Sequence, residues 1–131
     1  IESATSPVIS AQCLRVACSD GHMAAASVKF KNKPSKEVMI ERWNNFKGRA
    51  QELNLPSAPE HYLTYCEEDN RPQTKLDRMT ENGMGVTIGR LREDTIFDYK
   101  FVSLSHNTLR GAAGGAVLMA ELLCAEGYMD R

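Results

Sequence analysis

Alternating apolar and polar positions predict two β-strands near the start of the chain. Side chains in residues 8–18 alternate between two faces, and those in residues 22–31 do the same with many alanines. This period of two is that of a strand. Ser19-Asp20-Gly21 lies between the two segments, and Asp-Gly between strands favours a tight turn. We therefore predict a hairpin with its turn at Gly21.

A helical period replaces the strand period after Pro34. Ser35 has the character of an N-cap residue, and Met39, Trp43 and Phe46 follow at helical spacing until Gly48. This apolar stripe is predicted to lie on a sheet. The single tryptophan is therefore expected in the core rather than at a binding surface.

Three further strands are predicted, over residues 62–66, 85–91 and 96–104. The last of these is apolar on both faces, which indicates a central strand or an interface. Residues 67–84 are polar and include Pro72 and Gly83. A loop of this length is either a solvated excursion or a functional segment.

A final helix is predicted from Asn107-Thr108 to about Ala125, with Gly127 as its end. Its first turns contain several glycines, each of which costs about 1 kcal/mol relative to alanine in a helix. Close approach of another segment would explain them, because they do not form a dinucleotide-binding fingerprint. Together the elements predict an α+β fold, with a mostly antiparallel or mixed sheet and helices on one face.

Composition narrows the range of partners. The 131 residues are enough for one domain, and 16 basic and 17 acidic residues give a net charge of −1. This balance gives no electrostatic reason to expect nucleic acid or an anionic membrane as a partner. Four cysteines without C-x-x-C spacing are expected to be reduced thiols in the cytoplasm, and no metal site is predicted.

The candidate chemistry lies in Arg15 and His22, seven residues apart. An arginine can hold a carboxylate with two hydrogen bonds, and a histidine can move a proton near neutral pH. Residues seven apart point to opposite faces of an ideal strand, so the pair converges only if the chain bends at Gly21. The alternative is an ordinary surface arginine followed by an ordinary turn histidine.

Four segments resemble the aspartate-β-semialdehyde dehydrogenases, in the form typical of their fungal branch. They are Gln-Cys-Leu-Arg-Val-Ala-Cys-Ser-Asp-Gly-His at 12–22, and the segments at 71–78, 85–94 and 105–115. Their order and the Arg15-to-His22 spacing are those of the family. The resemblance implies the last third of such an enzyme, with the fold of the C-terminal domain of semialdehyde and glyceraldehyde-phosphate dehydrogenases.

The resemblance also implies an activity. The family reduces β-aspartyl phosphate to aspartate semialdehyde with NADP as cofactor, through a cysteine thioacyl intermediate, in lysine, methionine and threonine biosynthesis. His22 matches the family's acid/base histidine, and Arg15 matches the arginine that binds the substrate carboxylate. Asn107 matches a position that contacts NADP.

This chain departs from the family in lacking the nucleophilic cysteine's asparagine-rich context and the glycine-rich nucleotide loop. Residues 1–131 are therefore interpreted as a C-terminal catalytic and dimerisation fragment without its nucleotide-binding domain, on which residues 107–126 would pack. It is expected to form a homodimer or a dimer of dimers, to bind NADP poorly and to be inactive alone. The alternatives are a non-catalytic dimerisation or interaction module, and a related acyl-phosphate reductase acting on another acid.

Overall fold

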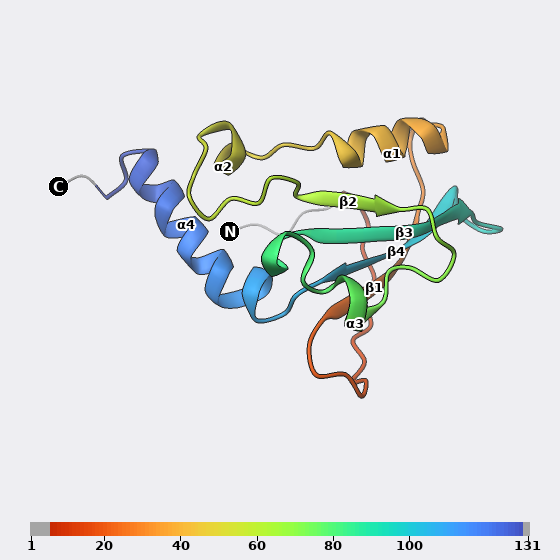
Figure 1. Ribbon diagram of the computed structural model, residues 1–131. Helices are drawn as coiled ribbons and strands as arrows, with labels where there is room; N and C mark the ends of the chain where they lie inside the picture. Colours follow the sequence, from red (N-terminus) through yellow and green to blue (C-terminus); the bar gives the residue numbers. More distant parts are fainter. Residues whose placement is uncertain (1–5, 130–131) are drawn as a thin grey trace.

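The structure is a computed structural model that describes residues 6–129, built on a four-stranded mixed sheet (Figure 1). The strands are β1 (His22–Val28), β2 (Leu63–Cys66), β3 (Val86–Glu93) and β4 (Tyr99–Ser105). Their order is β1-β4-β3-β2. Both neighbours of β4 are antiparallel to it, and β2 runs parallel to β3. The predicted α+β class and mostly antiparallel sheet are confirmed, and β4 is a central strand.

The helical elements are α1 (Lys36–Asn44), α2 (Arg49–Glu52), α3 (Thr74–Asp77), the 3₁₀ turn η1 (Thr80–Gly83), the π-helical turn η2 (Leu109–Ala113) and α4 (Gly114–Ala125). Ser35 caps α1 as predicted, because its Oγ accepts a hydrogen bond from the Val38 N–H at 3.3 Å. The helix ends at Asn44, earlier than predicted, and Gly48 instead precedes α2.

The main core lies between α1 and one face of the sheet. Met39, Leu91 and Tyr99 are buried there. Trp43 stacks on Tyr65 with 6.0 Å between ring centroids and lies 5.1 Å from the ring of Phe101. The tryptophan therefore belongs to the core, as predicted, and it fixes α1 on the sheet through aromatic contacts.

A second buried cluster joins α2, the start of β2 and α4 through Ala50, Tyr62 and Leu118. Polar contacts reinforce it at the surface. Both carboxylate oxygens of Glu121 accept hydrogen bonds from Ser57, one from its N–H at 2.9 Å and one from its hydroxyl at 2.7 Å. These contacts hold the inner side of α4 on the body of the molecule.

Residues 67–84 cover the opposite face of the sheet, so the predicted polar loop is in fact a packed layer containing α3 and η1. Thr87 and Leu104 face each other across β3 and β4, and both are under 2% exposed beneath this layer. The sequence pattern did not predict that this segment covers the sheet, because the segment is polar. Hydrogen bonds, and not an apolar stripe, hold it in place.

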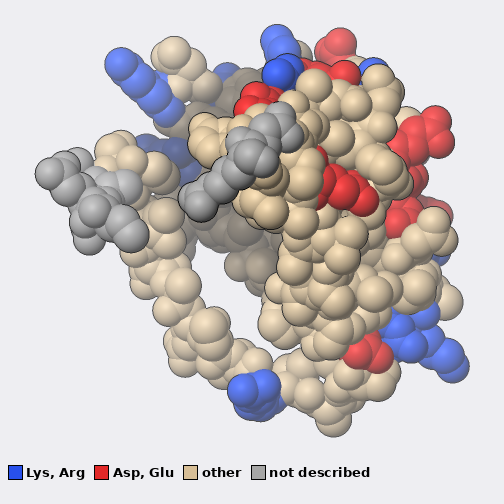
Figure 2. All heavy atoms as spheres, turned by 90° about the vertical axis from the view of Figure 1, so that its left-hand side faces the viewer, with Lys and Arg blue, Asp and Glu red and all other residues tan. Residues whose placement is uncertain are grey.

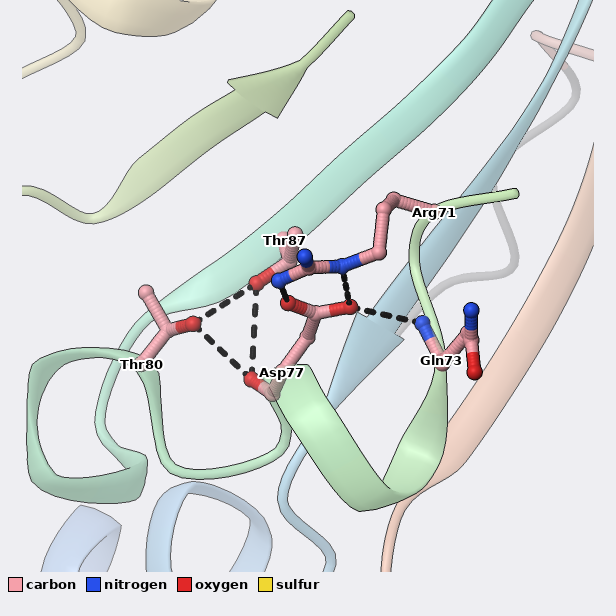
Figure 3. A network of polar contacts seen from close by, with 5 residues as sticks. All are labelled: Arg71, Gln73, Asp77, Thr80 and Thr87. Atoms are coloured by element: carbon pink, nitrogen blue, oxygen red, sulfur yellow. Dashed lines mark hydrogen bonds and ion pairs between the residues drawn. The ribbon is translucent and has the colours of Figure 1, made fainter. Parts of the chain in front are cut away.

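Asp77, which is 4% exposed, anchors this layer. Figure 3 shows the polar contacts around it. The Arg71 guanidinium donates two hydrogen bonds to the Asp77 carboxylate, and the Gln73 N–H donates to the same carboxylate at 2.6 Å. The Asp77 carbonyl accepts from Thr80 Oγ1 at 2.9 Å, and Thr80 in turn contacts the Thr87 hydroxyl at 3.0 Å. The polar segment is thus joined to β3 with its buried charge compensated.

The predicted strand over residues 8–18 and its hairpin are wrong. Residues 6–19 are an exposed arm without strand structure, on which Val8 is 95% and Val16 is 73% exposed. Figure 2 shows a thin run of chain separated from the body by an open gap. Alternation records which faces a segment can bury, but a strand also needs a partner edge, and the arm does not pair with β1.

The last helix starts irregularly. The Gly111 and Ala113 N–H groups donate to the carbonyls of His106 and Thr108, five residues earlier, at 3.0 and 2.8 Å. A Cβ on Gly114 would lie 2.5 Å from Met84 Sδ, so the close approach predicted from the glycines is present. Gly127 follows the helix with a φ of +77°, as expected for its end. None of the helices between residues 6 and 129 is long and apolar enough to cross a membrane.

Candidate functional site

His22 is the first residue of β1 and is exposed, and its strand partner is Ser105 at the end of β4. The residue before it, Gly21, is buried with a φ of +106°. A Cβ at Gly21 would lie 3.1 Å from a Leu104 methyl carbon and 3.3 Å from a Thr74 methyl carbon. Both the left-handed backbone and the tight space require glycine at this position.

Asn107 lies beside this turn. Its side-chain oxygen Oδ1 accepts a hydrogen bond from the Gly21 N–H at 2.9 Å, although the two residues are 86 positions apart. The pairing of His22 with Ser105 brings them together, because it places the residues flanking the strand ends next to each other. Two of the three predicted site residues, His22 and Asn107, therefore meet at one end of the sheet.

Sequence reasoning missed two residues at this end. Arg78 Nη1 donates to the Ser19 hydroxyl at 2.9 Å, which ties the turn to the segment that follows α3. His106 is 6% exposed, and its Nδ1 accepts the N–H groups of Thr108 and Leu109 at 3.2 Å each. The imidazole thus accepts the free N–H groups at the start of η2, as a serine or asparagine side chain often does at a helix start. Composition alone does not suggest this role.

Arg15 lies elsewhere, on the exposed arm. The structure joins Asn107 to the His22 turn, but it leaves Arg15 in solvent without a strand to orient it. The binding of a substrate carboxylate by Arg15 stays a prediction, because it requires the arm to lie close to His22 in the assembled protein.

The four cysteines are free thiols. Cys18 donates a weak hydrogen bond to the Gly21 carbonyl at 3.7 Å. Burial raises the pKa of the Cys66 thiol, and the charge of Asp77 raises it further. Cys66 therefore lacks the lowered pKa of a reactive thiolate. Within residues 6–129, no group of three or more His, Cys, Asp or Glu side chains is placed to hold a metal ion.

The site at the end of the sheet thus consists of the exposed imidazole of His22 and the preceding residue, Gly21, whose N–H is held by the side chain of Asn107. An exposed imidazole can exchange protons with a ligand, and the neighbouring amide can donate a hydrogen bond to it. This arrangement suits proton transfer to a polar substrate. It offers neither a nucleophile nor a phosphate cradle within the described residues.

Comparison with known proteins gives a consistent result. The family model for the semialdehyde dehydrogenase dimerisation domain matches residues 1–110. Aspartate-semialdehyde dehydrogenase of Saccharomyces cerevisiae is 46% identical over 119 residues, which are 89% of this chain and 33% of that protein. A malonyl CoA reductase (NADP) of Metallosphaera sedula is 45% identical over 119 residues, again 89% of this chain and 33% of that protein.

A solved structure agrees with the sequence matches. The crystal structure of aspartate semialdehyde dehydrogenase with NADP from Candida albicans matches with a TM-score of 0.73 and 38% identity, over 82% of this chain and 31% of that one. The chain therefore spans about a third of the length of the relatives it matches.

Proposed function

Because this chain belongs to the semialdehyde dehydrogenase family and carries its dimerisation domain, we propose that it is part of an NADP-dependent aspartate-semialdehyde dehydrogenase. The intact protein would reduce β-aspartyl phosphate to aspartate semialdehyde in the cytoplasm, for lysine, methionine and threonine synthesis. The observation that carries the proposal is the turn before His22, where the Gly21 N–H donates to Asn107 Oδ1 at 2.9 Å and so places two of the residues that the resemblance assigns to the site at one end of the sheet. Identity of 46% to the yeast enzyme supports it.

We assign His22 the proton transfers of this reaction. Its exposed imidazole can first accept the proton of a thiol and later return a proton to the tetrahedral intermediate. The thioacyl bond would form on a cysteine of the remaining part of the protein, because none of the four cysteines in this chain lies in the asparagine-rich context of the family's nucleophile. This chain would therefore supply proton transfer without the nucleophile.

Arg15 is assigned to the substrate carboxylate, which its guanidinium can bind through two parallel hydrogen bonds. This role requires the exposed arm to close toward His22 in the assembled protein. The exposed apolar side chains of the arm, with Val8 at 95% and Val16 at 73%, are consistent with a segment that is covered on assembly.

The reduced cofactor, NADPH, would supply the hydride of the family reaction when it is bound. In this chain Asn107 fits one edge of that cofactor, because its amide nitrogen can donate to a carboxamide while Oδ1 accepts from Gly21. The sequence has no glycine-rich phosphate loop. The chain alone is therefore expected to bind NADP poorly, and a neighbouring nucleotide-binding part would hold most of the cofactor.

We propose that the intact protein assembles as a homodimer or a dimer of dimers through this domain. We further propose that α4 is docked by another part of the protein, because the apolar side chains of Val117 and Met119 are 52% and 55% exposed on it. The side of the molecule on which α4 lies shows mainly uncharged residues (Figure 2). We assign this surface to the nucleotide-binding part of the same protein, on which the resemblance to the family implies that residues 107–126 would pack.

The test is an assay of the intact protein that contains this sequence. NADPH should form from NADP, phosphate and aspartate semialdehyde, and the 131-residue chain alone should give no turnover. The malonyl CoA reductase of Metallosphaera, 45% identical over the same share of the chain, makes malonyl-CoA the second candidate substrate. NADPH oxidation with malonyl-CoA and no reaction with aspartate semialdehyde would replace the proposal with that alternative.

A further inference from the structure

The orientation of His22 depends on the turn that precedes it. Upstream of this turn, residues 6–19 are exposed and form no strand, so the arm cannot fix the imidazole from that side. Downstream, β1 pairs with β4 only, since β1 is the edge strand of the sheet. The contacts of the 19–21 turn therefore decide how the first residue of β1 is presented.

Two side chains from distant segments hold the turn. Arg78 donates to the Ser19 hydroxyl at 2.9 Å, in an exposed position. Asn107 accepts from the Gly21 N–H at 2.9 Å, in a partly buried position and next to His22 in sequence. The buried bond is the stronger constraint, because an exposed bond competes with water.

Asn107 is itself held on both sides. It is two residues beyond Ser105, the strand partner of His22. It directly follows His106, whose buried imidazole caps the next helical turn with bonds of 3.2 Å to the N–H groups of Thr108 and Leu109. A side chain fixed between a strand end and a capped helix can impose its position on the turn that it binds.

We propose that Asn107 is a positioning residue that aims His22 through the Gly21 backbone. Only Oδ1 is used in this bond, so the amide nitrogen can donate to the cofactor at the same time. One amide would then set the imidazole and the cofactor edge relative to each other. This inference rests on the proposed function, and it adds to the cofactor contact a role toward the catalytic histidine.

The first test needs no activity. In the 131-residue chain, amide hydrogen exchange at Gly21 should be slowed by the bond, and Asn107→Ala should abolish this protection. The same change should shift the imidazole NMR signal of His22 but not that of His61; the chain has only three histidines. Asn107→Asp keeps an oxygen acceptor and should restore most of the protection.

The matched control is Asn44→Ala. The Asn44 Oδ1 also accepts a backbone N–H, that of Tyr65 at 3.1 Å, at the other side of the sheet. Loss of this bond should leave the Gly21 exchange rate and the His22 signal unchanged. A Gly21 amide that exchanges freely in the wild type, or an unchanged His22 signal in Asn107→Ala, would overturn the proposal.

The second test uses the intact enzyme. Asn107→Ala should lower kcat at least tenfold and change the pH profile of kcat, while the KM for aspartate semialdehyde changes less than threefold, because misplacement of a reacting group acts mainly on kcat. Failure of the proposed function would appear differently, as an intact wild type without activity on this substrate while Gly21 remains protected. An active wild type with an unchanged pH profile in Asn107→Ala would refute the positioning role.

Discussion

Asp77 is a carboxylate almost removed from water, at 4% exposed, yet it stays ionised. The hydrogen bonds from Arg71 hold the pKa of Asp77 below its usual value, and they outweigh burial, which acts in the opposite direction. The Gln73 N–H adds to the stabilisation of the charge. The Arg71–Asp77 ion pair thereby fixes the 67–84 layer internally, and the Thr80 hydroxyl of this layer contacts the Thr87 hydroxyl of β3 at 3.0 Å.

We predict that Asp77→Asn lowers the free energy of unfolding by about 2 kcal/mol at pH 7, because it removes charged hydrogen bonds and leaves Arg71 unpaired. A folded-state pKa below the unfolded value means that this stability is present above the unfolded pKa. It is lost as the pH falls from about 4 through the lower folded pKa.

Urea unfolding between pH 3 and pH 7 measures this effect. Asp98→Asn is the control, because the Asp98 carboxylate accepts an exposed hydrogen bond from the Phe30 N–H. The Asp77 variant should lose part of the acid sensitivity that the wild type and the control show. Equal acid sensitivity in all three proteins would mean that Asp77 contributes no pH-dependent stability.

At the residue scale, contacts between residues close in sequence could be predicted, and contacts between residues far apart in sequence could not. Ser35 was identified as an N-cap because its pattern is complete within four residues. The contact between Asn107 and Gly21 was not foreseen, because it joins residues 86 positions apart and depends on the register of β1 with β4. The resemblance to the family assigned roles to both His22 and Asn107, but it did not predict the hydrogen bond between their segments.

At the scale of elements, β3 shows how a strand accommodates the layer that covers it. A Cβ on Gly89 would lie 2.5 Å from the Arg71 carbonyl oxygen and 3.1 Å from Pro72 Cδ. Because the nearest atom belongs to the backbone, the obstruction cannot be relieved by a side-chain rotation. The glycine is therefore needed for the close approach of the 67–84 layer.

We predict that Gly89→Ala destabilises the protein by about 1–3 kcal/mol, as overpacking does, although alanine is otherwise the better strand residue. Gly111→Ala is the matched control, since its nearest neighbour would be 3.6 Å away and it lies in a helical turn. The control should be neutral or stabilising by up to about 1 kcal/mol. Thermal unfolding of both variants measures this difference, and equal melting temperatures would contradict the steric argument.

Elements with their partners nearby in sequence were predicted well. The helix after Ser35 and the strands before and after Glu93 were all identified, with ends that differ by a few residues. The arm at residues 8–18 was wrongly predicted as a strand, because its alternation shows two faces but no partner edge. The 67–84 layer was predicted as a loop, because its anchor is a polar network with no helical or strand period.

At the scale of the whole molecule, the structure changes which residues should matter for dimerisation. The strand that contains Phe101 was expected to be central or at an interface, and it is central in the sheet. The Phe101 ring packs against Trp43 in the core, with 5.1 Å between ring centroids, so its substitution would disrupt the fold and not only a dimer contact. Met23 on the edge strand β1 is 50% exposed, on the same sheet face as its partner Leu104.

We predict that the chain sediments as a dimer at micromolar concentration and that Met23→Glu shifts it to monomer, because a charge at an apolar contact costs its desolvation. Val38→Glu is the control, since Val38 is 43% exposed on α1, away from the edge strand. Sedimentation equilibrium distinguishes the cases. A dimer unaffected by Met23→Glu would place the contact on another surface.

On our proposal, this domain contributes the acid/base histidine, His22, to a reductase. The most direct measurement is kcat of the intact protein with aspartate semialdehyde, compared between His22→Asn and His61→Asn. Both histidines are exposed. His61 lies just before β2, and its Nε2 is 3.9 Å from Oε1 of Glu60. We predict a loss of about 10²–10⁴-fold for His22→Asn and no more than a twofold change for His61→Asn. An unchanged kcat in His22→Asn, with the protein folded and assembled, would show that His22 is not the acid/base residue.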